Sequence, residues 1–251
     1  MSTEIAEMFG NLKLRYAKEA YRSLDGDVNL MSSITVDDAF TSVLTAEIDG
    51  RAAARRKMLM NMAKIPFPSE LRDVQYDDNR GQEFVKVMSR VRTMSFIETG
   101  SNVCILGSSG SGKSFVASAL AREAVAKGYS TYYTNTADEA SLLAEKRHQG
   151  ASVYQKARSK LARTRLLILD DFCLNKPSDD EIQSLFDIMN DRSGRNSTMV
   201  ISQKDQNRWL EELGITAIGE AVVERIKASS ITVMMGPGSR RRTLDESPAS
   251  A

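Results

Sequence analysis

One short segment constrains the fold of this 251-residue chain more than any other, a glycine- and serine-rich loop with the pattern G-x-x-x-x-G-K-S. The loop consists of Gly107, Ser108, Ser109, Gly110, Ser111, Gly112, Lys113 and Ser114. The apolar run 102–106 before it predicts a strand, and the stretch 115–126 after it predicts a helix. Between a strand and a helix, such a loop turns its backbone N–H groups toward an anion. The sequence therefore predicts a nucleotide site, and a purely structural serine-rich turn is the alternative.

Polar residues at the ends of two later strands complete the predicted site. The apolar run 165–169 ends in Asp170 and Asp171, which places two carboxylates at the carboxyl edge of a sheet. We expect Asp170 to hold Mg²⁺ and Asp171 to orient or deprotonate the attacking water. Because aspartate is shorter than glutamate, we expect hydrolysis to be slow or conditional. Gln203 is the predicted sensor of the γ-phosphate, with Ser202 as the alternative.

Three further side chains have expected roles at the nucleotide. Lys113 is expected to contact the β- and γ-phosphates of ATP, and the Ser114 hydroxyl is expected to bind Mg²⁺. Arg225, near the end of a predicted helix, could neutralise transition-state charge in the site of a neighbouring subunit. A surface ion pair between Arg225 and Glu224 is the alternative.

Composition narrows the class of protein. With 41% hydrophobic and 27% charged residues, the chain has ordinary globular composition. No apolar run reaches the roughly 18 residues that span a bilayer, and the N-terminus lacks a signal-peptide layout, so we expect a cytoplasmic protein without membrane contact. Cys104 and Cys173 lack metal-ligand spacing and are expected to be reduced packing residues. The lone Trp209 is likewise expected to pack in the interior.

The N-terminal part, 1–64, is predicted to be a small helical domain for DNA binding or oligomerisation. Apolar spacing predicts one helix over 3–24 and a second from Thr35 onward, which Gly50 could weaken or break. Four basic residues follow at helical spacing and could lie along a phosphate backbone, although a solvated face is the alternative. These residues are Arg51, Arg55, Arg56 and Lys57.

The second predicted domain, 65–243, begins at a proline-rich boundary over 65–69. Strand and helix patterns then alternate, which predicts an α/β fold: a parallel sheet with helices on both faces. The expected helices lie at 82–97, 137–148 and 178–189, and the expected strands after the loop lie at 129–134, 166–169 and 198–201. The tail, 244–251, is expected to be disordered.

A second basic segment lies between Lys146 and Arg165 and contains no acidic residue. A solvated face usually intersperses acids among bases, so this composition favours contact with nucleic acid, mainly with its backbone and shape. The residues that we expect to contact DNA are Arg147, Lys156, Arg158 and Lys160.

The motifs GSSGSGKS, LLILDDF, STMVISQ and VVERI, in this order after a Pro-Phe-Pro linker, resemble those of the IstB-like transposition helper ATPases of bacterial insertion sequences. These are relatives of the helicase loader DnaC and the initiator DnaA in the AAA+ class. The resemblance implies an AAA+ P-loop NTPase core without a lid domain, preceded by a small all-α domain. It also implies that Arg240 contacts the nucleotide, with Arg241 and Arg242 as alternatives. Cys173 stands where the family commonly has glycine.

The same resemblance implies an ATP-dependent helper that oligomerises on duplex DNA through ATP sites shared between subunits. Such a protein could deform the DNA and recruit or activate the transposase of the same insertion sequence. Mg²⁺-dependent hydrolysis, stimulated by DNA or partner, would then dismantle the assembly. Two alternatives remain open: a helicase loader that acts on single-stranded DNA, and a small-molecule P-loop kinase.

Overall fold

The computed structural model describes residues 2–76 and 80–236 of the chain. Two compact units make up the chain, Met1–Met58 and Leu59–Ala251. The first unit contains the helices α1 (Thr3–Asn11), α2 (Arg15–Asp25) and α3 (Val28–Ser33) and most of α4 (Val36–Ala63). The last turn of α4 belongs to the second unit, where Leu59 and Ala63 pack against Val125.

The prediction of one helix over 3–24 is wrong, because the chain turns between α1 and α2. Lys13 adopts a left-handed φ of 54°, and the N–H of Leu14 donates to the carbonyl of Phe9, five residues earlier. This is the hydrogen-bond pattern of a helix that ends in a left-handed residue. The turn brings the ring of Phe9 to 5.7 Å from the ring of Tyr21, so α1 packs back on α2.

Gly50 does not break the second predicted helix, since α4 continues through it to Ala63. A Cβ atom at Gly50 would lie 2.1 Å from the ring of Tyr16, so the glycine makes room for α2 to pack on α4. Glu47 of α4 also accepts a hydrogen bond of 2.8 Å from the N–H of Ala17 in the first turn of α2. Because the N-cap position of α2 is a leucine, this carboxylate takes the place of a local cap.

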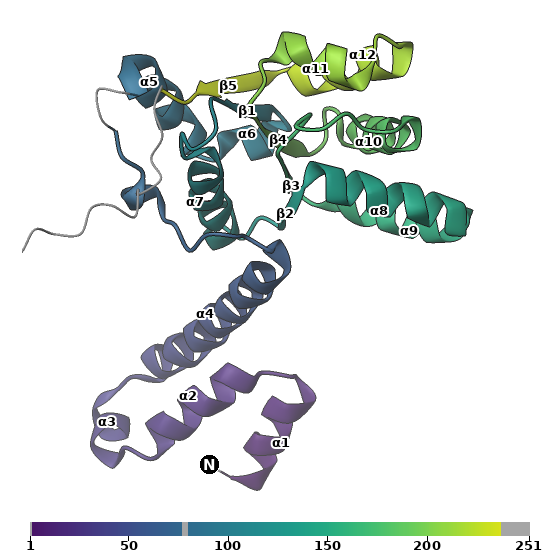
Figure 1. Ribbon diagram of the computed structural model, residues 1–251. Coiled ribbons are helices and arrows are strands. Elements are labelled where there is room, and N and C mark those ends of the chain that lie inside the picture. The colour runs from purple at the N-terminus through teal and green to yellow at the C-terminus, as the bar shows by residue number, and fades with distance from the viewer. Residues whose placement is uncertain (1, 77–79, 237–251) are drawn as a thin grey trace, which may run out of the picture. The chain divides into compact units, whose positions relative to one another are not determined.

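The second unit is built on a parallel five-stranded sheet with the order β2-β3-β4-β1-β5 (Figure 1). The strands are β1 (Asn102–Leu106), β2 (Thr131–Asn135), β3 (Leu166–Asp170), β4 (Ser197–Ser202) and β5 (Ser230–Met234). The helices are η1 (Leu71–Asp73), α5 (Gly81–Val91), α6 (Ser95–Thr99), α7 (Lys113–Ala126), α8 (Thr136–Gln149), α9 (Ala151–Arg163), α10 (Asp179–Arg192), α11 (Gln206–Leu213) and α12 (Ala217–Lys227).

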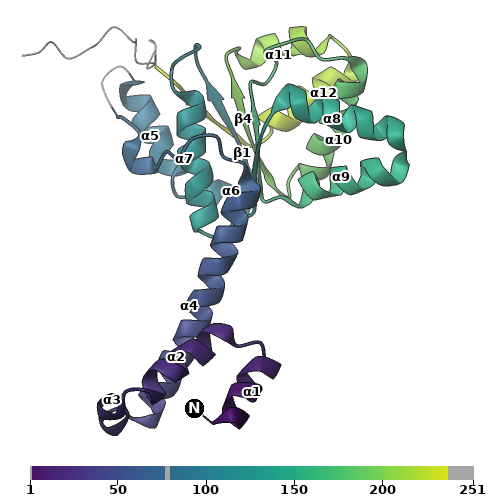
Figure 2. The ribbon, with the colours of Figure 1, turned by 60° about the horizontal axis from the view of Figure 1, so that its bottom comes forward.

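Helices cover both faces of this sheet, as the sequence predicted (Figure 2). Alternate strand residues point to opposite sides. Val103 and Ile105 of β1 join a core with α5, α6 and α7, whereas Cys104 and Leu106 join a core with α10, α11 and α12. The fold class that we expected is therefore confirmed.

The helix expected over 82–97 is two helices. The chain turns at Met94, which has a left-handed φ of 66°, and α6 then begins at Ser95. The turn buries Met94, Phe96 and Ile97 together in the core beneath α7. Apolar spacing alone could not reveal it, because both helices place apolar residues in the same core.

The strand order fixes the arrangement of the predicted site. Because β4 lies between β1 and β3, the loop after β1, the residue after β4 and the carboxylates at the end of β3 meet in this order at the carboxyl edge. This edge is where open parallel sheets bind their ligands.

Candidate functional site

The loop after β1 depends on glycine at three positions. Gly110 and Gly112 adopt φ values of 79° and 88°, in the left-handed region that residues with a Cβ rarely occupy. A Cβ atom at Gly107 would lie 2.7 Å from the Cβ atom of Met235, so packing requires glycine there. These glycines give the backbone the curvature that an anion-binding loop needs.

The polar groups of the loop fit a phosphate chain. The Nζ atom of Lys113 is buried in the loop and donates hydrogen bonds of 2.8 Å to the carbonyl oxygens of Gly107 and Ser108. The Ser111 hydroxyl is buried and has no hydrogen-bond partner among the described residues. The N-terminus of α7 has no side-chain cap. Phosphate oxygens can accept from the Ser111 hydroxyl and from the uncapped N–H groups of α7, so the loop fits ATP.

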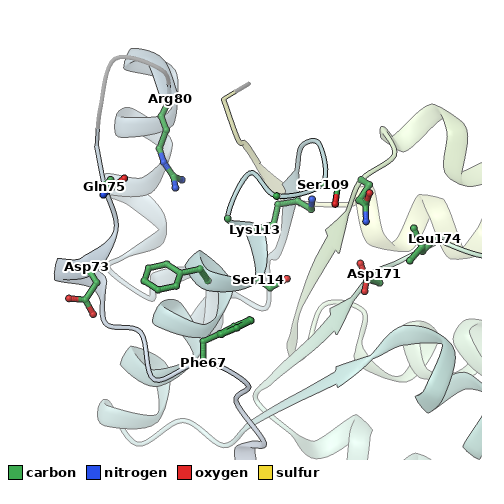
Figure 3. Close-up of a pocket in the computed structure, with 13 residues that line it drawn as sticks. Phe67, Asp73, Gln75, Arg80, Ser109, Lys113, Ser114, Asp171 and Leu174 are labelled. Atoms are coloured by element: carbon green, nitrogen blue, oxygen red, sulfur yellow. The ribbon is translucent and has the colours of Figure 1, made fainter. Parts of the chain in front are cut away.

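A cavity of about 530 Å³ opens beside the loop (Figure 3). This volume lies within the range of small-molecule and cofactor sites. The side chains that line it come from the loop, from the ends of β3 and β4, and from the segment before α5. They are Phe67, Asp73, Gln75, Arg80, Ser109, Gly110, Gly112, Lys113, Ser114, Phe115, Asp171, Leu174 and Gln203. The cavity thus brings together four separate parts of the chain.

The two carboxylates at the end of β3 have different surroundings. Asp171 lines the cavity and has a left-handed φ of 53°. Asp170 is half-buried: its Oδ2 accepts a 2.5 Å hydrogen bond from the Tyr133 hydroxyl, and its Oδ1 accepts one of 2.8 Å from the N–H of Asp171. Burial and the charge of Asp170 raise the pKa of Tyr133, so the phenol keeps its proton and remains a donor. Carboxylate and hydroxyl oxygens suit Mg²⁺, so Asp170 and Ser114 fit this ion.

Of the two residues considered as a sensor, Gln203 lines the cavity and Ser202 is fully buried. The Ser202 hydroxyl donates to the carbonyl of Phe172 at 2.8 Å and accepts from the indole N–H of Trp209 at 3.0 Å. Ser202 therefore holds the chain after β3 in place, and the geometry favours Gln203. Trp209 is fully buried, which confirms its predicted packing role.

One wall of the cavity was not predicted from the sequence. Asp73, Gln75 and Arg80 lie across the cavity from Asp171 (Figure 3), and Phe67 lines it as well. We interpreted the proline-rich segment only as a domain boundary, but it runs along the start of α7. The aromatic residue between its two prolines was the available signal, because a pure linker has no need of one.

The segment is fixed there by a hydrogen bond of 2.9 Å from the Ser69 hydroxyl to the carbonyl of Phe115. Ser69 itself is buried. The proline-rich stretch is therefore part of the cavity wall.

Arg225 lies on α12 and does not line the cavity. Its guanidinium group stacks 4.8 Å from the ring of Phe186 and donates hydrogen bonds to the Asn190 side chain and the Ala221 carbonyl. These contacts hold a half-buried arginine on the surface formed by α10 and α12.

Two of the four arginines and lysines predicted for DNA contact in the second basic segment are occupied within the fold. Arg158 makes two hydrogen bonds to Asp191, of 2.5 and 2.6 Å, and Arg147 donates to Asp187 at 3.0 Å. Both aspartates lie on α10, so the acids absent from the segment come from another helix. Both side chains are thus engaged by protein carboxylates, and we expect Lys156 and Lys160 to be the main phosphate contacts of this segment.

Three other basic residues of the segment line a groove of about 610 Å³. Lys156, Lys160 and Arg163 are exposed there, and no acidic side chain is among the described residues that line it. Ser130 directly precedes β2, and Thr164 lies two residues before the start of β3. The groove is therefore at the amino edge of the sheet. We call it the basic groove.

The four basic residues of the first unit that are predicted to contact DNA lie on α4 and are exposed: Arg51, Arg55, Arg56 and Lys57. Arg51 is paired with Glu47 at 2.6 Å and donates to the carbonyl of Lys13, so it also braces the turn before α2. The hydrogen bonds from Ala17 and Arg51 outweigh the effect of burial and lower the pKa of Glu47.

Some predictions concern residues outside the part of the chain that the structure describes. Arg240, its alternatives Arg241 and Arg242, and the tail 244–251 all lie there. Both cysteines are free and buried, as predicted, and burial raises the pKa of Cys104 to about 11 and that of Cys173 to about 12. Cys173 has a left-handed φ of 56°, which agrees with glycine being common at this position in the family that the sequence resembles. Within the described residues, no helix is long and apolar enough to cross a membrane.

Solved structures share this fold. The DnaC helicase loader superimposes with a TM-score of 0.52 at 21% identity, over 71% of this chain and 99% of the loader. DnaA from Aquifex aeolicus, solved with AMPPCP bound, gives a TM-score of 0.55 at 20% identity, over 68% of this chain and 51% of that protein. These likenesses establish an AAA+ P-loop fold.

Closer relatives come from insertion sequences. A protein of Bacteroides fragilis, named for an IS21-like insertion sequence and for ATP binding, is 27% identical over 83% of this chain and 78% of its own length. A protein of Sinorhizobium fredii with a similar name is 30% identical over 77% of this chain and 76% of its own length. The family model described as IstB-like ATP binding protein matches residues 8–247. The chain therefore belongs to the family of IstB-like ATP binding proteins, which confirms the resemblance seen in its motifs.

Proposed function

We propose that this protein is an ATP-dependent DNA-binding helper of transposition, which assembles on duplex DNA with ATP bound and disassembles after hydrolysis. The observation that carries the proposal is the single cavity shared by the loop residue Lys113, the carboxylate of Asp171 and the amide of Gln203. Family membership supports ATP as the nucleotide. The insertion-sequence names of its relatives support the transposase of the same element as the partner.

Each group in the cavity has a role that its position supports. The loop and Lys113 hold the phosphates, while Phe67 and Gln75 offer an aromatic surface and an amide to the nucleoside. Asp171 orients or deprotonates a water, and Gln203 contacts the γ-phosphate or that water. Ser114, which lines the cavity, and Asp170, at the end of β3, would hold Mg²⁺, which would neutralise charge on the phosphate oxygens. All of these residues act before and during cleavage of the terminal phosphate.

Arg225 acts on the site of a neighbouring copy, so that hydrolysis requires assembly. Its position on α12, outside the cavity of its own chain, supports this role. A mixing experiment tests it. Arg225→Ala and Asp171→Asn proteins should each be inactive alone, whereas a mixture should regain turnover, because some sites then combine an intact Asp171 with an intact Arg225. A mixture as inactive as its components would refute action in trans.

Duplex DNA binds along the basic groove. Lys156 and Lys160 offer exposed ammonium groups, and the hydroxyls of Ser130, Ser152 and Thr164 line the same surface. Such groups contact phosphates and carry no base sequence information, so binding depends mainly on the backbone and its shape. Three exposed basic side chains of the first unit supply further contacts with DNA phosphates. They are Arg55, Arg56 and Lys57 of α4.

One assay separates this proposal from its alternatives. ATP turnover is measured without DNA, with duplex DNA and with single-stranded DNA of equal length. We expect duplex DNA to raise turnover the most. Greater stimulation by single strands would instead indicate a helicase loader, and high turnover that neither DNA changes would favour a small-molecule kinase.

A further inference from the structure

Tyr133 lies on β2, which contributes no residue to the predicted motifs. Its side chain is 5% exposed and packs in the core beneath α7. Its hydroxyl donates a hydrogen bond of 2.5 Å to Oδ2 of Asp170, while the N–H of Asp171 donates to Oδ1. Both oxygens of Asp170 therefore have a fixed donor, and the carboxylate is held in one orientation.

The hydroxyls of Ser114 and Ser118, in the first two turns of α7, both lie near enough to the same phenol to act on its pKa. Asp170 is at the end of β3 and Ser114 is at the start of α7, and β2, α8 and α9 lie between these two elements in the chain. One phenol oxygen thus adjoins both residues that fit Mg²⁺. No other side chain is described as bonded to the Asp170 carboxylate.

We infer that Tyr133 is a positioning residue for the divalent cation, because it holds the carboxylate of Asp170 in register with the hydroxyl of Ser114. This inference rests on the proposed function, since it concerns the ion that accompanies ATP. Tyr133 does not line the cavity; it acts through Asp170. Groups that orient metal-binding residues in this way commonly change metal affinity by about 10- to 100-fold when they are lost.

The next residue of the chain provides a matched control. Tyr132 precedes Tyr133 on β2, and its side chain points to the opposite face of the sheet, as alternation in a strand requires. Its hydroxyl also donates to a carboxylate, that of Glu139 at 3.2 Å. Tyr132→Phe and Tyr133→Phe therefore each remove one phenol donor from one carboxylate, and they differ in which carboxylate loses that donor.

The experiment measures binding without turnover. Full-length protein is saturated with a nonhydrolysable ATP analogue in EDTA, the EDTA is removed, and Mn²⁺ is titrated while free Mn²⁺ is followed by electron paramagnetic resonance. For Tyr133→Phe we expect about a tenfold weaker Mn²⁺ affinity and analogue binding in EDTA within about twofold of the unchanged protein. For Tyr132→Phe we expect both affinities to be unchanged. Retention of the ring keeps the core filled, and circular dichroism and the melting temperature check the fold.

Combination with Asp170→Asn tests whether Tyr133 acts through that carboxylate. If it does, Tyr133→Phe should weaken Mn²⁺ binding by less than about twofold in the Asp170→Asn background. Unchanged Mn²⁺ affinity in Tyr133→Phe, equal loss in Tyr132→Phe, or full additivity with Asp170→Asn would each overturn the inference. If the unchanged protein bound no nucleotide, both the inference and the proposed function would fail. If the unchanged protein bound nucleotide and Tyr133→Phe had normal Mn²⁺ affinity, only the inference would fail.

Discussion

The two edges of the sheet in the second unit carry polar groups of different kinds. At the carboxyl edge, Lys113 and Asp170 are held by short hydrogen bonds to neighbouring backbone and side-chain atoms. At the amino edge, the lysines of the basic groove are exposed on α9. The first arrangement suits one small ligand with a defined shape, and the second suits a polyanion recognised by charge.

Within the basic segment itself, the arginines Arg147 and Arg158 and the lysines Lys156 and Lys160 have different surroundings. Arg147 and Arg158 fold onto the aspartates of α10, whereas Lys156 and Lys160 remain exposed. The planar guanidinium group favours paired hydrogen bonds with a carboxylate, and Arg158 makes such a pair with Asp191. The number of arginines and lysines in a sequence segment thus overestimates the number of positive charges that can contact DNA.

The largest expected effect concerns the carboxyl edge. Lys113→Ala should weaken ATP binding by at least about 100-fold, because it removes a charged donor to the phosphates. Isothermal titration calorimetry measures this, and Lys127→Ala, at the far end of α7, is the control that should bind ATP normally. Tight binding by Lys113→Ala would remove the central assignment of the cavity.

A second variant separates binding from chemistry at the same edge. Asp171→Asn should lower turnover by about 100-fold or more and leave ATP affinity within a few fold, since only the carboxylate can take a proton from water. Asparagine tolerates the left-handed φ of 53° at this position, so the loop should keep its shape. Rapid turnover by this variant would place the reaction at another residue.

The amino edge should respond to charge alone. In Lys156→Gln/Lys160→Gln, the slope of log affinity for duplex DNA against log salt should fall by about 1.8, which corresponds to two lost phosphate contacts. Fluorescence anisotropy at several salt concentrations gives this slope. Lys86→Gln/Lys127→Gln is the control for net charge and should leave the slope unchanged; equal slopes in all three proteins would mean that DNA binds elsewhere.

The smallest expected effect tests the division between arginine and lysine. Arg158→Gln should lower the free energy of unfolding by about 1–3 kcal/mol, because it leaves Asp191 without its charged partner. The urea midpoint measures this loss. The DNA salt slope should not change. A lower slope with unchanged stability would show that Arg158 is available to phosphates after all.

Much of the carboxyl edge could be predicted from the sequence because its residues lie within short local patterns. A loop between strand and helix, or two acids after a buried strand, has a defined place in a parallel sheet. Continuous apolar runs likewise predicted β3 and β4, which are buried on both faces. Strand β5, at the sheet edge and only partly buried, gave no comparable signal.

The features that were missed depend on contacts between distant segments. The acids that bind Arg147 and Arg158 lie more than 30 residues away, and the proline-rich segment meets Phe115 across 46 positions. Gly50 was expected to weaken or break a helix. Its packing role could not be recognised from the local sequence, because its partner, Tyr16, lies in another helix. Tyr133 belongs to no sequence motif. Its role as a positioning residue depends on Asp170, which the pairing of β3 with β2 brings beside it.

The central claim is that nucleotide bound at the carboxyl edge of the sheet controls the affinity for duplex DNA at the amino edge. Two sites that are coupled must change each other's affinity by the same factor. The direct measurement is duplex affinity with and without a nonhydrolysable ATP analogue, together with analogue affinity with and without duplex. We predict that each ligand tightens the other by the same factor, at least about fivefold. Equal duplex affinity with and without the analogue would contradict the account.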